Sequence, residues 1–103
     1  MGYMLTGRHI PANRAYQLGL INEVVPIGKL DEAVNSWVSD ILRCAPLAVR
    51  ATKEATMRAL DYPLAQAYYT QYESNRPREN SQHALEGPRA FAENRPPNWQ
   101  GRS

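Results

Sequence analysis

Residues 86–102 read EGPRAFAENRPPNWQGR, and this tail carries the strongest pattern in the chain. Its first part predicts a short amphipathic helix, with one phenylalanine, Phe91, on the apolar face and basic residues near the C-terminal end. Two consecutive prolines, Pro96 and Pro97, then stop the helix, because proline lacks a backbone N–H and its ring clashes with the preceding turn. The pattern thus predicts a helix that ends abruptly before an exposed tryptophan, Trp99.

The chain is short of material for a hydrophobic core. Its 103 residues indicate one domain, and a domain of this size buries roughly 65% of the surface that its unfolded chain exposes. Hydrophobic residues make up 43% of the sequence, just below the ~45–50% of typical globular domains. We therefore expect an ordered protein that relies on another domain or subunit to bury part of its apolar surface.

Positive charge gathers in the last third of the sequence. The net charge of +2 is small for a dedicated nucleic-acid-binding protein, yet five arginines stand against three glutamates from residue 76 onward. These residues are Arg76, Arg78, Arg89, Arg95, Arg102, Glu79, Glu86 and Glu93. The surplus indicates either an ordinary solvated surface or a neighbourhood for anions, such as the phosphates of a nucleotide-bearing cofactor, because a positive field steers anions.

Cysteine and histidine usage indicates the compartment and argues against a metal site. Cys44 is the only cysteine, so no intrachain disulfide can form, and a reducing compartment, the cytoplasm, is expected. Cys44, His9 and His83 do not have metal-ligand spacing, and no metal is expected. No apolar run approaches the ~20 residues of a membrane span, and no signal peptide is visible, so we expect no membrane partner.

Residues 1–27 predict small and incomplete elements. Residues 3–5 resemble the last turn of a helix that Gly7 closes, and residues 11–18 predict a second helix. Residues 20–25, LINEVV, form a β-branched run that predicts one short strand. Because a lone strand cannot complete a ladder, its partner is expected in a segment upstream of this chain.

Three longer helices are predicted over residues 28–45, 46–60 and 63 to about 72. Each carries one face of apolar or small residues at helical spacing. These faces hold Leu30, Val34, Trp37, Ile41 and Ala45 in the first helix, Ala48, Ala51, Ala55 and Ala59 in the second, and Leu64, Ala67, Tyr68 and Tyr72 in the third. Because small side chains allow close approach, another helix is expected to pack against the second one.

A polar joint at residues 76–80 is predicted before the last helix, which Asn80 or Ser81 can cap. Gly87-Pro88 is expected to kink that helix or split it. The predicted fold is mainly α, about five helices with one short orphan strand. Each helix has one apolar face, and we expect these faces to be buried against another domain or subunit.

Patterns that indicate catalysis are weak. His83 and Glu86 have i,i+3 spacing, but they are best interpreted as a solvated helix pair. Glycine-rich phosphate loops are absent. Phe91 is either a core residue or part of an apolar pocket for an acyl chain, and Arg95 is either a helix C-terminal cation or a guanidinium contact to a phosphate.

Three stretches together resemble the enoyl-CoA hydratase/isomerase (crotonase) family. They are residues 4–26, with MLTGRHI at the start and LGLINEVVP at the end, residues 45–53, APLAVRATK, and the tail from Glu86 to Arg102. Each motif is soft, but their order and spacing cover nearly all of the chain. The tail looks closest to that of carnitinyl-CoA dehydratase-like members.

The resemblance implies the C-terminal helical part of a crotonase-like fold, whose spiral of stacked ββα turns would precede Met1. Residues 1–27 would be the end of that spiral core, and residues 28–103 would form a helical oligomerisation and lid region. The oxyanion hole and the glutamates that move protons would belong to the missing core. No catalytic residue is therefore assigned in this chain.

The resemblance also implies a substrate and an assembly. The parent enzyme would act on acyl-CoA thioesters, by hydration or dehydration of an α,β-unsaturated acyl-CoA. Coenzyme A would enter as part of the substrate, no cofactor would be bound permanently, and the protein would be a homo-oligomer, trimer or hexamer. We expect the 103-residue chain alone to be inactive.

Three residues are expected to bind substrate. Phe91 matches the family's aromatic residue that can line the acyl pocket. Asn94 stands where many members have a lysine that can approach the phosphates of the cofactor, so Arg95 is expected to substitute for it.

Two alternatives to an enzyme stay open from the residues alone. A non-enzymatic helical assembly module is suggested by the thin core and the single-faced helices. A weak nucleic-acid binder rests on the C-terminal arginines alone, and we expect no nucleic acid as a partner.

Overall fold

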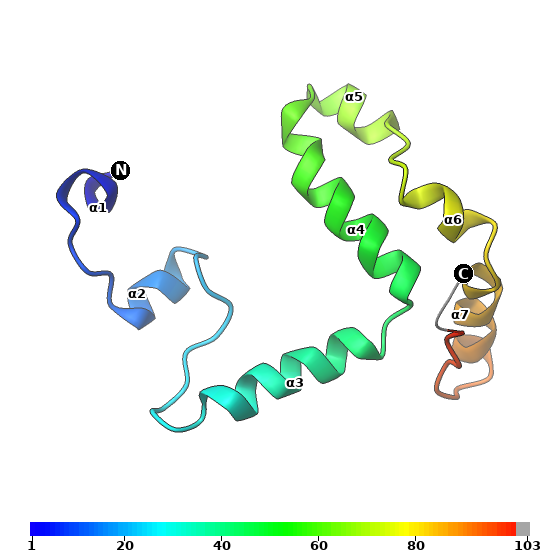
Figure 1. Ribbon diagram of the computed structural model, residues 1–103, viewed down its shortest axis with the longest axis horizontal. Helices are drawn as coiled ribbons and strands as arrows, with labels where there is room; N and C mark the ends of the chain where they lie inside the picture. The colour runs from blue at the N-terminus through cyan, green and yellow to red at the C-terminus, as the bar shows by residue number, and fades with distance from the viewer. Residues whose placement is uncertain (101–103) are drawn as a thin grey trace. The chain divides into compact units, whose positions relative to one another are not determined.

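A computed structural model describes residues 1–100; Gly101 and Arg102 of the tail lie outside the described residues. Residues 1–100 form seven α-helices and one 3₁₀ helix, with no strand among them (Figure 1). The prediction of a mainly helical protein is confirmed. The chain divides into two compact units, Met1–Ser36 and Trp37–Ser103, and each is described by itself.

Unit 1 begins with two short helices that end at glycines. α1 spans Gly2–Thr6 and α2 spans Ala12–Gln17. Gly7 and Gly19 follow them with φ of 65° and 75°, a region that glycine enters without the steric penalty of a Cβ. The predicted helix end at Gly7 is therefore confirmed.

Residues 20–25 do not form the predicted strand. The segment bends and then runs without ladder hydrogen bonds, because a strand requires a paired neighbour and residues 1–100 contain no other strand. A turn follows, in which the Lys29 N–H donates to the carbonyl of Pro26 at 3.1 Å. Gly28 has φ 87° in this turn, as the third residue of a type II turn requires, and the chain is thereby turned into the next helix.

α3, Leu30–Leu42, has the predicted apolar stripe. Asp31 and Glu32 lie in its first turn, where negative charge complements the helix dipole. The stripe is not covered by the described residues: Leu30 is 65% exposed and Ile41 is 51% exposed. The expectation of a thin core with uncovered apolar faces is confirmed for this helix.

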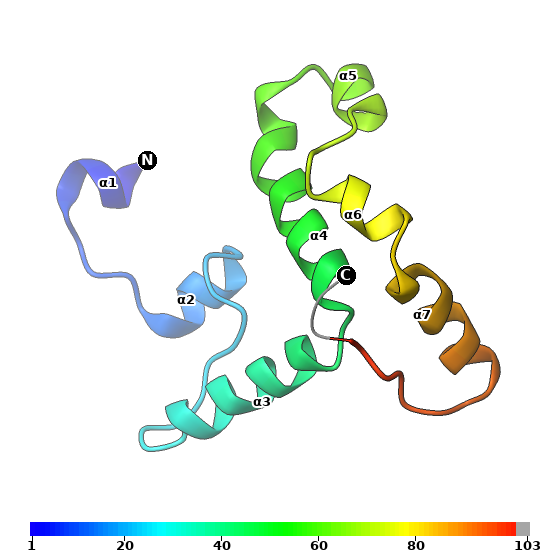
Figure 2. The ribbon, with the colours of Figure 1, turned by 45° about the vertical axis from the view of Figure 1, so that its right-hand side comes forward.

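Unit 2 contains the C-terminal part of α3, from Trp37 onward, and all later helices: α4, Pro46–Arg58; η1, the 3₁₀ helix Ala59–Asp61; α5, Leu64–Tyr69; α6, Asn75–Glu79; and α7, Gln82–Ala92. The chain runs along α4, reverses through η1 and α5, and returns through α6 and α7 (Figures 1 and 2). α6 packs against α4, and α7 contacts α6.

The alanine stripe of α4 forms the packed face of that helix. Ala51 is buried, and Ala48 and Ala55 are half-buried, as is Ala59 at the start of η1. The expectation that another helix packs on this stripe is confirmed, since α6 contacts α4. Small side chains on α4 allow this close approach.

Tyr72 is buried and lies in the segment that connects α5 to α6. It is therefore outside any helix, whereas the sequence predicts it within one. α5 ends at Tyr69, and the extended backbone of Thr70 follows. The guanidinium of Arg58 lies 5.5 Å from the centre of the Tyr72 ring. Glu54 accepts a hydrogen bond from the Ser74 N–H at 2.8 Å and another from Arg58 at 2.7 Å, and these bonds lower the pKa of Glu54. Together these contacts attach the α5–α6 segment to α4.

The predicted polar joint at residues 76–80 is wrong, because α6 forms there. Pro77 falls in the first turn of α6, where backbone N–H groups have no hydrogen-bond partner within the helix. A proline there therefore costs the helix no hydrogen bond. The Ser81 hydroxyl donates to the carbonyl of Arg78 at 2.7 Å and makes no side-chain cap for α7. Ser81 therefore stabilises the end of α6.

α7 runs unbroken through Gly87-Pro88, so the expectation of a split helix is wrong. A side chain before proline normally disfavours helical backbone, since its Cβ meets the proline ring. Gly87 has no Cβ, which allows the helix to continue into Pro88.

Candidate functional site

The C-terminal end of α7 is a Schellman motif with Asn94 at its left-handed position. The Arg95 N–H donates to the carbonyl of Ala90 at 3.1 Å, and the Asn94 N–H to that of Phe91 at 3.2 Å. Asn94 has φ 50° and is the one non-glycine residue with positive φ among residues 1–100. Asparagine tolerates this conformation better than most residues. Asn94 thus has a backbone role that the sequence interpretation missed.

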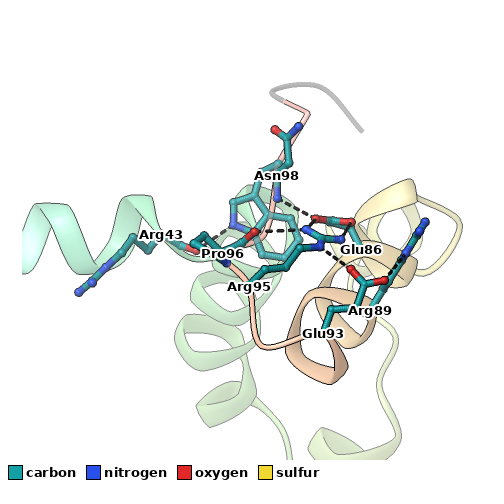
Figure 3. Close-up of polar contacts among 8 residues, drawn as sticks. Arg43, Glu86, Arg89, Glu93, Arg95, Pro96 and Asn98 are labelled. Atoms are coloured by element: carbon teal, nitrogen blue, oxygen red, sulfur yellow. Dashed lines mark hydrogen bonds and ion pairs between the residues drawn. The ribbon is translucent and has the colours of Figure 1, made fainter.

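Arg95 turns back along α7 and meets Glu86 (Figure 3). Its Nη1 donates to Oε1 of Glu86 at 2.7 Å, and its Nη2 to Oε2 at 3.0 Å. Its Nε donates to Glu93 at 2.5 Å, and Nη1 also donates to the carbonyl of Pro96 at 3.2 Å. Four of the five N–H groups of this guanidinium are thereby used within the chain.

The carboxylate of Glu86 accepts hydrogen bonds from two residues that follow α7, Arg95 and Asn98. Besides Arg95, its Oε1 accepts the backbone N–H of Asn98 at 2.8 Å. Arg95 first, and the Asn98 N–H second, lower the pKa of Glu86 to about 2. The carboxylates of Glu86 and Glu93 raise the pKa of Arg95 above its ordinary value. Arg95 and Glu86 are therefore both charged at neutral pH.

Glu93 connects two arginines. Arg95 and Arg89 both donate to its carboxylate, the latter at 2.9 Å, and they lower its pKa. Arg89 and Glu93 thus form an ion pair at i,i+4 spacing. Glu86 pairs with Arg95, 9 residues further along the chain, a separation that no helical spacing indicates.

Trp99 is half-buried, so the expectation of an exposed tryptophan is wrong. Its indole N–H donates to the carbonyl of Arg43, just past α3, at 2.8 Å. Its ring lies against Gly87: a Cβ at that glycine would be 3.4 Å from Cη2 of the indole. We call residues 95–100 the strap, because they cross α7 and reach the end of α3.

His83 is also buried, 4% exposed, and the interpretation as a solvated helix pair with Glu86 is wrong. Its Nε2 lies 2.6 Å from the carbonyl oxygen of Gln100, and its ring meets that of Trp99 edge-on at 5.5 Å. The Nδ1 atom is buried without a hydrogen-bond partner among the described residues. His83 is therefore part of the packing beneath the strap.

Phe91 is 86% exposed, so within this chain it is not a core residue. It lies on α7 in the turn that leads to Asn94, whose side chain is exposed as well. Arg95 is half-buried in the strap. The three predicted substrate-binding residues thus lie within one turn of chain, two accessible and one engaged in ion pairs.

Two shallow hollows flank the strap. One of about 460 Å³ is bordered mainly by small or apolar residues, among them Ala48, Gly87 and Trp99. The other, about 350 Å³, is lined by Glu86, Arg89 and their neighbours. Phe91 borders neither hollow. If it faces an acyl chain, that pocket needs atoms from beyond the described residues.

Comparison with known proteins gives the family. Residues 1–102 match the family model described as enoyl-CoA hydratase/isomerase. The chain belongs to the enoyl-CoA hydratase/isomerase family. It is 35% identical over 106 residues to the carnitinyl-CoA dehydratase of Salmonella typhi, covering 96% of this chain and 40% of that protein. Family members that it matches are thus longer, and the chain spans about two fifths of their length.

Solved structures agree with this assignment. The chain superposes on an enoyl-CoA hydratase/isomerase from Mycobacterium paratuberculosis with a TM-score of 0.86 and 39% identity, over 94% of this chain and 38% of that one. An enoyl-CoA hydratase from Mycobacterium tuberculosis gives a TM-score of 0.85 and 36% identity, over 94% and 38%. The predicted fold class, the helical part of a crotonase-like fold, is confirmed.

The described residues show neither a membrane span nor a metal cluster. No helix among residues 1–100 is both long and apolar enough to cross a membrane. Nor do these residues contain a cluster of three or more histidine, cysteine or acidic side chains that could hold a metal ion.

Proposed function

We propose that this chain is the C-terminal helical part of an enzyme that adds water to, or removes it from, an α,β-unsaturated acyl-CoA. The family match over residues 1–102 supports an acyl-CoA enzyme. Relatives named enoyl-CoA hydratase and carnitinyl-CoA dehydratase support hydration and dehydration in particular. Coenzyme A would be part of the substrate, without a permanently bound cofactor.

The observation that carries the structural part of the proposal is the exposure of large apolar side chains on ordered helices. Phe91 on α7 is 86% exposed, and Leu64 and Tyr68 on α5 are 87% and 81% exposed. Exposed apolar area of this kind indicates surfaces that are covered in the working protein. We assign residues 1–27 to the end of the spiral core and residues 28–103 to trimer or hexamer assembly and to a lid.

Phe91 is proposed to line the acyl pocket, since its ring is accessible and no described side chain covers it. Asn94 follows it in the Schellman turn, and its side chain is exposed. Its proposed role is to meet the phosphates of coenzyme A. Arg95 has one N–H, on Nη2, left over from its bonds to the described residues. A phosphate contact from Arg95 would use that N–H and stays a prediction.

The chemistry would take place against the spiral core. The family resemblance implies an oxyanion hole of two backbone N–H groups, which stabilises the thioester carbonyl as it becomes an enolate. This chain's own part would be to hold the acyl chain at Phe91 and to exclude water from the site. No catalytic residue is assigned among residues 1–103.

Turnover of crotonyl-CoA tests the proposal. The protein encoded by the complete reading frame should abolish the enone absorbance as water adds across the double bond, and residues 1–103 alone should not. Failure of the complete protein to turn over any enoyl-CoA would contradict the hydratase assignment. Turnover by the isolated chain would contradict the assignment of catalysis to another segment.

A non-enzymatic assembly module is the second candidate, favoured by the uncovered apolar stripe of α3, where Leu30 and Val34 are 65% and 49% exposed. Light scattering over a range of concentrations separates the candidates when it is combined with the turnover assay. A concentration-dependent oligomer without turnover would favour the module. A stable monomer would argue against both the module and the proposed trimer. A location in the cytoplasm stays a prediction.

A further inference from the structure

The strap attaches α7 to the rest of unit 2 by contacts that converge on few atoms. Glu86 accepts hydrogen bonds from Arg95 and Asn98. Beyond Asn98, Trp99 donates to the carbonyl of Arg43 at the end of α3. A chain of contacts therefore runs from the C-terminal turn of α7, through Glu86, to the end of α3.

Glu86 differs from an ordinary surface glutamate in its partners. Its carboxylate accepts three N–H groups, at 2.7, 2.8 and 3.0 Å, and all three come from the strap. The side chain is only 19% exposed. Charge-assisted and bidentate bonds of this kind are the strongest that a carboxylate makes with protein donors. Figure 3 shows Arg95 and Asn98 reaching Glu86 from two sides.

The position of the strap determines the turn that carries the proposed substrate contacts. The Arg95 N–H closes the Schellman motif on Ala90, and Phe91 and Asn94 lie inside that loop. Displacement of Arg95 from Glu86 would therefore release the turn in which Asn94 is held at φ 50°. Phe91 and Asn94 would then be presented over a wider range of positions.

We infer that Glu86 is a positioning residue: by holding Arg95 and Asn98 of the strap, it sets where α7 presents Phe91 and Asn94 to the acyl-CoA. The inference rests on the proposed function, because that function supplies the acyl-CoA that Phe91 and Asn94 would contact. Glu86 acts through the strap and touches neither the acyl chain nor the phosphates.

Graded substitutions in the complete protein test this role by steady-state kinetics. Glu86→Gln keeps an amide oxygen for the Asn98 N–H but loses the charge that pairs with Arg95, and Glu86→Ala loses both. KM for crotonyl-CoA should rise about tenfold for Glu86→Ala, the ratio that matches one charge-assisted hydrogen bond, and less for Glu86→Gln. The value of kcat should be unchanged, since the transition-state contacts lie elsewhere.

Arg43→Gln is the matched control. It removes an exposed arginine that pairs with Asp40, yet keeps the backbone carbonyl that accepts the Trp99 N–H. KM should stay at the wild-type value. A change in KM of the same size as for Glu86→Ala would show that loss of any nearby ion pair suffices, and would overturn the inference.

Hydrogen exchange of the strap amides, followed by mass spectrometry, provides a readout without substrate. Peptides that cover residues 95–100 should exchange faster in Glu86→Gln and fastest in Glu86→Ala. Faster exchange with an unchanged KM would overturn the positioning role, as would a loss of kcat alone. Unchanged exchange would show that Glu86 does not hold the strap. A wild-type protein that protects its strap but turns over no enoyl-CoA would contradict the proposed function instead.

Discussion

Replacement of Pro88 by alanine should stabilise α7 by about 2 kcal/mol. Pro88 lies inside the helix and is exposed, so its substitution changes no buried packing. Proline in a helix interior costs about 3 kcal/mol relative to alanine. About 1 kcal/mol of this is offset, because proline also restricts the unfolded chain. The difference between these two effects is about 2 kcal/mol. It includes the hydrogen bond that the restored N–H of residue 88 can donate to the carbonyl of Ala84.

The effect of Gly87→Ala on the stability of α7 should depend on whether residue 88 is proline. Alanine is favoured over glycine in a helix interior by about 0.5–1 kcal/mol. The new Cβ would lie 3.4 Å from Cη2 and 4.0 Å from Cζ3 of Trp99, which is ordinary van der Waals contact. The proline ring, however, clashes with a Cβ on the residue before it. The full gain should therefore be seen only when Pro88 has been replaced.

Native-state hydrogen exchange of the α7 amides measures these effects in the complete protein. Pro88→Ala should slow exchange roughly thirtyfold if α7 opens locally, because each 1.4 kcal/mol corresponds to a factor of ten. Gly87→Ala should slow exchange further when it is added to Pro88→Ala, and less, or not at all, when Pro88 is kept. Ala65→Ser, on the exposed surface of α5, serves as a control that should leave α7 unchanged.

Two results would contradict these roles of Pro88 and Gly87. Faster exchange in Pro88→Ala would mean that the proline ring stabilises α7 through a contact absent from residues 1–100. An equal effect of Gly87→Ala in both backgrounds would mean that the steric demand of Pro88 is not the reason for the glycine.

Three further predictions concern the strap and the turn before it. Asn94→Gly should stabilise the protein by up to about 1 kcal/mol, since glycine has no Cβ to strain at φ 50°; a lower melting temperature would contradict the left-handed turn. Trp99→Phe keeps a ring against Gly87 but loses the N–H bond to Arg43, so denaturant unfolding should show a loss of about 1 kcal/mol; no loss would mean that the bond is not formed. The pKa of Glu86 is lowered to about 2 from 4.5, so its stabilisation should be complete above pH 4.5 and lost as the pH falls toward 2. The difference in strap exchange between wild type and Glu86→Gln should shrink over that range, and a difference independent of pH would contradict the ion pair.

Helices with local start and stop signals could be predicted from the sequence. α4 begins at Pro46, as its proline indicates, and its alanine stripe is packed because small residues at helical spacing leave room for α6. α6 was missed because a proline among charged residues was interpreted as a joint. The same proline is well placed in the first turn of a helix.

The strap could not be predicted because its contacts join distant residues. Trp99 meets Arg43 across 56 positions, and Glu86 meets Arg95 around a turn that lies outside the helical repeat. The local signal that was available is Asn94, since asparagine is the common substitute for glycine after a helix end. Interpreted that way, it would have indicated a chain reversal and a return of Arg95 toward α7.

Whether this helical segment faces the acyl-CoA of a hydratase can be measured by photolabelling with an acyl-CoA that carries a photoreactive group on its acyl chain. With the complete, active protein, we expect a label on the α7 peptide that contains Phe91, and competition by unlabelled crotonyl-CoA should remove it. Labelling confined to other segments, with α7 free of label while the enzyme turns over, would show that α7 does not face the acyl chain.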